Sequence, residues 1–199
     1  GEFHMYLQPK YYLSDPNREG PAPERPAQGD TVSGGPVLHS AEALVRWYSG
    51  DGTIHYPDEF IPVFEENGFI TELDMYMLEE ACAFLKRLEK NGYADICISV
   101  NQSRILFYKA DYLNEIQRII HKYHCDPSRI ILEVTEGITM DNLDEMKVLV
   151  RELHKMGFAV SMDDFGSGYS SLNILKELDI DELKLDRVFL SDTAEKEKR

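Results

Sequence analysis

The chain has 199 residues, a length that suits one domain, and 36 acidic side chains against 21 basic ones give a formal net charge of −15. This charge opposes broad binding to nucleic acid polymers or to anionic lipid. Hydrophobic residues make up 43% of the chain, which excludes a disordered protein, and no run approaches the roughly 20 consecutive apolar residues of a transmembrane helix.

The chain opens with an aromatic, β-like run from Met5 to Leu13 and then changes composition abruptly. Residues 14–36 contain five of the nine prolines and four glycines, with almost no large apolar side chain. Such a segment buries too little surface to offset the entropy of ordering it. We therefore expect a flexible surface insertion over about residues 14–36.

From Val37 onwards, short apolar runs alternate with amphipathic stretches. The predicted strands are Ser40–Arg46, Ile96–Asn101, Ile130–Val134, Ala159–Asp163 and Leu183–Asp186. The predicted helices are Thr71–Lys90, capped by Thr71 and Asp74 and stopped by Gly92, then Asp111–Tyr123, a helix from Asp141 to Gly157, and Ser170–Leu178. Strands that alternate with helices over short connections predict βα units around a mostly parallel sheet.

Polar residues stand on the predicted strands, near the ends where the βα loops of such folds converge. They are Gln8, Glu42, Arg46, Asn101, Glu133, Glu136, Asp163, Asp164, Lys184 and Asp186. Each is ambiguous alone. A glutamate in an apolar strand usually reaches solvent or an arginine, an asparagine more often forms a turn, and a lysine ending a strand is usually solvated. The run after the fifth strand, Asp-Asp-Phe-Gly-Ser-Gly, also suits a plain helix-entry loop.

Together these residues favour a metal site. Several carboxylates on one rim repel each other and raise one another's pKa unless a cation neutralises them. Oxygen donors without histidine or cysteine select Mg²⁺, Mn²⁺ or Ca²⁺. Adjacent Asp163 and Asp164 can flank two metals, an arrangement that assists phosphoryl displacement. Lys184 can orient an attacking water or offset developing negative charge.

The same residues resemble a known family. Glu42-Ala43-Leu44, within Ala41–Trp47, resembles the signature of the EAL domain, the bacterial cyclic di-GMP phosphodiesterases. Further motifs follow in family order over nearly the whole chain. They are Tyr6–Pro9, Glu59–Pro62, Ser99–Asn101, Glu133–Glu136, Asp163–Ser171 and Leu183–Arg187. The resemblance implies a modified TIM-like barrel with an irregular first strand that hydrolyses cyclic di-GMP to linear pGpG.

The resemblance also implies roles for individual residues. Two ions, Mg²⁺ or Mn²⁺, would be held, the first by Glu42, Asn101, Glu133 and Asp163, the second by Asp163 and Asp164. Glu42, Lys184 and Asp164 would be the catalytic residues, with Lys184 contacting the water nucleophile. Gln8 and Arg46 would contact the guanine and phosphate of the ligand, and Leu44 would line its pocket. Glu136 would stabilise the loop from Asp164 to Ser171, which couples to dimerisation in the family.

Two departures from the family are expected to matter. The segment 14–36 is longer than the corresponding family turn, and the chain ends before the last two strands, with their glutamate and a guanine-reading glutamine. Residues 1–199 are therefore expected to form a partial EAL domain. The alternatives are a cyclic di-GMP receptor that does not hydrolyse its ligand, and a dimerisation module.

The resemblance also sets expectations about surroundings. It implies a homodimer when the domain is complete, and a diguanylate cyclase or sensor domain in the same polypeptide, with no DNA or RNA polymer as partner. The three cysteines (Cys82, Cys97 and Cys125) lack metal-ligand spacing and sit in apolar patterns, which predicts buried thiols in a reducing compartment. A cytoplasmic location is expected, either alone or as part of a membrane-anchored protein.

Overall fold

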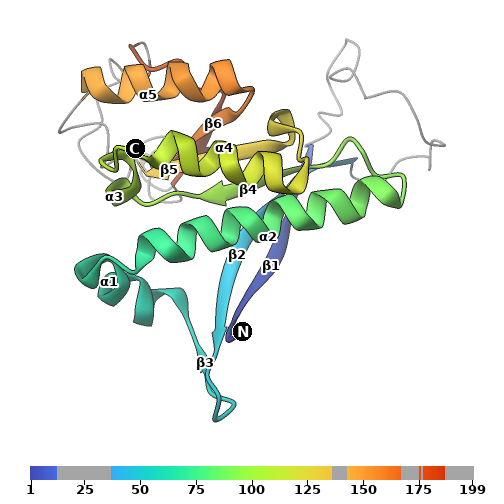
Figure 1. Cartoon of the computed structure of the whole chain (residues 1–199), viewed down its shortest axis with the longest axis vertical. Helices are drawn as coiled ribbons and strands as arrows, with labels where there is room; N and C mark the ends of the chain where they lie inside the picture. The colour runs from blue at the N-terminus through green and yellow to red at the C-terminus, as the bar shows by residue number, and fades with distance from the viewer. Residues whose placement is uncertain (13–36, 136–142, 167–174, 176, 187–199) are drawn as a thin grey trace, which may run out of the picture.

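A computed structural model describes residues 1–12, 37–135, 143–166, 175 and 177–186 (Figure 1). Its strands are β1 (Phe3–Tyr12), β2 (Val37–Tyr48), β3 (Ile54–His55), β4 (Cys97–Asn101), β5 (Ile130–Thr135), β6 (Ala159–Phe165) and β7 (Glu182–Leu185). Its helices are α1 (Pro57–Asn67), α2 (Ile70–Lys90), α3 (Arg104–Phe107), α4 (Tyr112–Tyr123) and α5 (Leu143–Met156), with a 3₁₀ turn at Pro127–Arg129. The predicted insertion at residues 14–36 lies outside the described residues.

The strands form one sheet in the order β1-β2-β4-β5-β6-β7, and β3 pairs with β2 at the side of this path. The pairs from β2 to β7 are parallel, as the βα alternation predicts, whereas β1 runs antiparallel to β2. Only residues Ser40–Ala43 of the long strand β2 pair with β4. Glu42 therefore lies near the end of the parallel part of the sheet, although it is in the middle of its strand.

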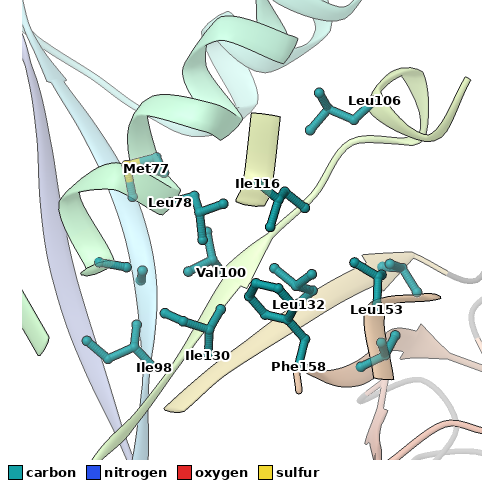
Figure 2. Close-up of a cluster of buried hydrophobic side chains, with 14 of the residues drawn as sticks. Met77, Leu78, Ile98, Val100, Leu106, Ile116, Ile130, Leu132, Leu153 and Phe158 are labelled. Atoms are coloured by element: carbon teal, nitrogen blue, oxygen red, sulfur yellow. The ribbon is translucent and has the colours of Figure 1, made fainter. Parts of the chain in front are cut away.

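The apolar core lies between the sheet and the helices. Val100 and Leu132 of the sheet meet Leu78 of α2, Ile116 of α4 and Leu153 of α5, and all five side chains are buried (Figure 2). Because strand residues alternate between faces, this packing leaves the intervening residues of the central strands on the opposite face. That face carries the polar side chains described below.

A second, smaller cluster buries Phe60 of α1 with Ile70 and Leu73 of α2. Phe3 and Trp47, from the β1–β2 ribbon, pack against it. Neither α1 nor β3 nor α3 is predicted from the sequence, because each is short or lacks a clear hydrophobic period. This cluster joins the antiparallel ribbon to the helical layer, so it supports the strands that carry the site.

The predicted cap of α2 is wrong. The helix begins at Ile70 after Phe69, whose side chain makes no capping hydrogen bond. The Thr71 hydroxyl instead donates to the Gly68 carbonyl (3.1 Å), and Asp74 Oδ2 accepts from the backbone N–H of Ser103 (2.7 Å). Asp74 therefore ties the helix to the loop that follows β4. The predicted cap Asp141 and residues 170–174 and 176 of the last predicted helix lie outside the described part of the chain.

Glycines end two helices at the predicted places. Gly92 and Gly157 follow α2 and α5 with φ of +86° and +97°, a left-handed conformation that favours glycine. The three cysteines are free thiols, of which Cys82 and Cys125 are buried and Cys97 is partly exposed. Within the described ranges, no helix combines the length and the apolar character that a membrane crossing requires.

Candidate metal centre

Three carboxylates converge on the polar face of the sheet. Glu42 of β2, Glu133 of β5 and Asp163 of β6 each offer an oxygen, and these oxygens lie within 4.8 Å of one another. The strand register helps to explain this convergence. Asn101 on β4 pairs with Glu133 on β5. Two residues further along β5, Thr135 pairs with Asp163 on β6. The Glu133 side chain is fully buried, and those of Glu42 and Asp163 are 17% and 20% exposed.

A single ammonium group holds these carboxylates together. Nζ of Lys184, on β7, lies 2.9 Å from Glu42 Oε2, 2.8 Å from Glu133 Oε2 and 2.9 Å from Asp163 Oδ2. Burial acts to lower the pKa of Lys184, but its hydrogen bonds and the charge of Glu133 outweigh burial and raise the pKa well above the ordinary value. The lysine is therefore charged at any physiological pH.

Asn101 reaches the cluster through Glu42. Its Nδ2 donates a hydrogen bond to Glu42 Oε1 at 3.3 Å. Its side-chain oxygen could serve as a further ligand atom for a metal ion. The next residue, Gln102, is buried and fixes this part of the chain. Its backbone N–H donates to the Glu133 carbonyl (2.9 Å), and its side-chain oxygen accepts from the Tyr112 hydroxyl (3.0 Å).

Asp164 is adjacent to the cluster but is not one of the three converging carboxylates. Its φ of +56° turns the chain sharply at this point, and its backbone N–H donates to Asp163 Oδ1 at 2.8 Å. Burial, followed by the charges of Asp163 and Asp186, raises the pKa of Asp164 above its ordinary value. An additional cation near this carboxylate would relieve the repulsion.

The predicted ligand-contacting residues share the polar face of the ribbon. Gln8 of β1 lies directly opposite Glu42, and Leu44 and Arg46 follow at alternate positions of β2. The Arg46 guanidinium lies 5.9 Å from the centre of the Tyr6 ring and donates to the Val45 carbonyl (2.8 Å). Glu136 lies outside the described residues, as does the loop beyond Gly166.

Two charged residues of this face are assigned no role by the sequence analysis. Lys10 Nζ lies 3.0 Å from Glu133 Oε1 and 2.8 Å from Glu182 Oε1. The two-residue period of a strand could have placed both residues on the polar face. Lys10 follows Gln8 by two residues on β1, and Glu182 precedes Lys184 by two residues on β7. What the sequence does not show is that the sheet curls enough for the Lys10 side chain on β1 to reach β5 and β7.

The donor set suits a hard divalent cation. It consists of three carboxylates and one amide oxygen, and such oxygen donors suit Mg²⁺, Mn²⁺ or Ca²⁺. An ion with metal–oxygen distances of about 2.1 Å has neighbouring ligand oxygens about 3 Å apart and opposite ones about 4 Å apart. The three carboxylate oxygens lie within 4.8 Å of one another, so they would move closer together to bind one ion. These residues fit a metal of this class.

Comparison with known proteins agrees with this geometry. A family model described as the EAL domain matches residues 31–199. The chain is 38% identical over 160 residues to the bifunctional diguanylate cyclase/cyclic di-GMP phosphodiesterase MucR of Pseudomonas aeruginosa. This alignment covers 80% of this chain and 23% of MucR. It is 39% identical over 155 residues to the signaling protein YkoW of Bacillus subtilis, and that alignment covers 78% of this chain and 19% of YkoW.

A solved structure described as the PaMucR phosphodiesterase in complex with c-di-GMP has the same fold. It superimposes with a TM-score of 0.79 at 34% identity, over 97% of this chain and 70% of that one. This likeness confirms the predicted fold of EAL type, a curled sheet that forms part of a TIM-like barrel. The chain spans about a fifth of the length of the two curated relatives, at 23% and 19%.

Proposed function

The chain belongs to the EAL domain family, and from this premise we propose that it binds cyclic di-GMP and hydrolyses it to linear pGpG with the help of Mg²⁺ or Mn²⁺. One observation carries the proposal: three carboxylates from three parallel strands meet at a single lysine ammonium. This arrangement provides oxygen ligands for a cation and a positive donor beside it. Hydrolysis of a phosphodiester uses both.

Glu42, Asn101, Glu133 and Asp163 would hold one ion, and Asp163 with Asp164 a second. When bound, such ions polarise a phosphoryl oxygen and lower the pKa of a water molecule. The raised pKa of Asp164 supports the second position, because burial and the crowding charges of Asp163 and Asp186 disfavour the ionised carboxylate, which a nearby cation would stabilise. The proposal of two ions rests on this crowding and on the family resemblance.

Lys184 would hold the attacking water and offset negative charge on the phosphoryl group. In the reaction the water oxygen bonds to phosphorus and gives up one proton, the bond from phosphorus to the ribose 3′-oxygen breaks, and that oxygen takes up one proton to leave as a hydroxyl group. The lysine suits this role because an ammonium carries a positive charge and three N–H donors, which the three carboxylates would release in part when they bind an ion. It acts as a fixed charge and hydrogen-bond donor, not as the base.

Gln8, Leu44 and Arg46 would bind the dinucleotide along the ribbon next to the metal centre. Arg46 supplies a cation for a phosphate group, and Gln8 offers amide donors and acceptors for a guanine edge. The net charge of −15 is compatible with a dianionic ligand because the ions and Arg46 are concentrated at the site. The proposed selectivity therefore depends on local charge rather than on the overall charge.

The surroundings of the domain remain proposals too. Several relatives are longer proteins, and MucR is described as bifunctional, which supports a diguanylate cyclase or sensor domain in the same polypeptide. A homodimer, a cytoplasmic location and the assignment of residues 1–199 to one partial EAL domain stay predictions from the sequence.

The test is a chromatographic assay of cyclic di-GMP turnover in Mn²⁺, comparing the unaltered chain with Glu42→Gln. We expect pGpG as the product and a loss of at least about 100-fold in the variant, because changing even the outer partners of metal ligands costs 10–100-fold. Glu89→Gln, which alters an exposed carboxylate of α2, is the matched control and should keep full activity. Equal rates for Glu42→Gln and the unaltered chain would refute the assignment.

The same assay separates the alternative function. Calorimetric binding of cyclic di-GMP by the unaltered chain without any pGpG would identify a receptor instead of an enzyme. Absence of both binding and turnover in the folded chain would leave the dimerisation module.

A further inference from the structure

We propose that Lys10, paired with Glu182, is a positioning residue for the metal ligand Glu133. It would hold Oε1 of Glu133 so that Oε2 alone faces the other carboxylates. The inference rests on the proposed function only in that it takes Glu133 as a metal ligand. It assigns a role to two residues, Lys10 and Glu182, that lie outside the three converging carboxylates.

The geometry at Glu133 carries the inference. Lys10 Nζ lies 3.0 Å from Oε1, and Lys184 Nζ lies 2.8 Å from Oε2, so a different ammonium holds each oxygen of one carboxylate. The Glu133 side chain is fully buried, and burial removes the alternative of turning toward solvent. Its carboxylate plane is therefore fixed from both sides. Oε2 lies on the side of Glu42 and Asp163, whose own oxygens bond to the same Lys184.

The contact crosses the inside of the curled sheet. Lys10 is on β1 and Glu133 on β5, and β2 and β4 separate them in the strand order. Lys10 pairs in register with Ser40, Glu42 with Ser99, and Glu133 with Ser161. These three serines are completely buried and have small side chains. Small residues at these positions leave room for the long lysine stem to reach Glu133 through the interior.

Glu182 partly balances the positive charge of Lys10. Its Oε1 lies 2.8 Å from Lys10 Nζ, so the ammonium is shared between Glu182 and Glu133. The pair also links β1 and β7, the two ends of the strand order. A shared ammonium orients Glu133 while withdrawing less negative charge from the cation site than an unshared one would.

A simple electrostatic view predicts the opposite effect on cation binding. Removing a positive charge beside an acidic site should strengthen the attraction of a divalent cation. Removing a positioning contact should weaken it, because loss of an outer hydrogen-bond partner typically lowers metal affinity about 10–100-fold. The sign of the change therefore distinguishes the two accounts, and a purely structural ion pair would change the melting temperature without changing the affinity.

The experiment measures Mn²⁺ affinity from the electron paramagnetic resonance signal of the free ion, with the folded full chain. We expect Lys10→Met to bind Mn²⁺ about 10-fold more weakly, and the double variant Lys10→Met with Glu182→Gln to show the same loss. The double variant leaves no unpaired carboxylate at residue 182, so it stays testable where the single variant fails to fold. Lys10→Arg keeps a cationic donor and should recover most of the affinity.

The matched control is Lys86→Met with Glu89→Gln, which removes an exposed ion pair of α2 and causes the same change in charge. It should leave Mn²⁺ affinity unchanged. Unchanged or tighter binding by the Lys10 double variant would overturn the inference about Lys10. Absence of Mn²⁺ binding by the unaltered chain would overturn the proposed metal site instead, so the two failures are distinguishable.

Discussion

At the scale of single residues, Lys184 compensates the charge of three carboxylates at once. It bonds to three carboxylates that would otherwise face one another across a partly buried space. Removing one partner of a buried ion pair costs about 3–5 kcal/mol, because the remaining charges lose their compensation. The ammonium and a metal ion serve the same electrostatic need, so each should partly replace the other in stabilising the fold.

This view makes a prediction for Lys184→Met. In the presence of EDTA the variant should lose about 3 kcal/mol of unfolding free energy, because the three carboxylates lose their shared ammonium, although Glu133 keeps its contact with Lys10. Saturating Mn²⁺ should narrow the difference from the unaltered chain, which thermal denaturation with and without the ion will measure. Lys122→Met, at an exposed pair with Glu79, is the control and should cost less than about 1 kcal/mol in both conditions. A difference that Mn²⁺ leaves unchanged would contradict the prediction.

At the scale of elements, α2 determines where the loop after β4 lies. Asp74 of this helix accepts the Ser103 N–H, and Gln102 bonds to the β5 backbone and to Tyr112 of α4. Burial raises the pKa of Asp74 to about 6, although its hydrogen bonds with Ser103 act in the opposite direction. Asn101 stands next to this anchored segment, so the helix indirectly sets the position of a metal-facing residue.

Asp74 therefore predicts a specific pH dependence. Because its pKa is higher in the folded chain than the ordinary 3.8, this group stabilises the fold most below about pH 4, and that contribution is lost as pH rises through about 6. Asp74→Asn cannot ionise and can still accept the Ser103 N–H. Its stability relative to the unaltered chain should therefore increase between pH 4 and pH 7, by at most about 3 kcal/mol. Urea denaturation at several pH values measures this difference, and a difference that does not change with pH would refute it.

Element boundaries also show where sequence reasoning succeeds and fails. The helices α2, α4 and α5 are predicted within a few residues because their apolar stripes are long and regular. The cap of α2 is predicted wrongly because Asp74 bonds to a loop far along the chain, a contact that a local pattern does not contain. Helix α1 is missed because its first turn begins with Pro57 after a two-residue strand, and its buried stripe is short.

At the scale of the whole molecule, the curl of the sheet joins residues that the sequence keeps far apart. Parallel strand order brings Glu42, Glu133 and Asp163 together, and the period of each strand places them on one face. That much follows from the sequence, because strand ends converge in α/β folds. The link from Lys10 to Glu182 does not, since it depends on how far the sheet turns between β1 and β7.

The most direct test of the account is to locate Mn²⁺ by anomalous diffraction from crystals of this chain. We expect an anomalous peak for an ion within bonding distance of oxygens of Glu42, Glu133 and Asp163. The Nζ atom of Lys184 should then no longer contact all three carboxylates. Lys10 should still bond to Oε1 of Glu133. An ion bound elsewhere, or no peak at these carboxylates in saturating Mn²⁺, would contradict the assignment of this cluster as the metal centre.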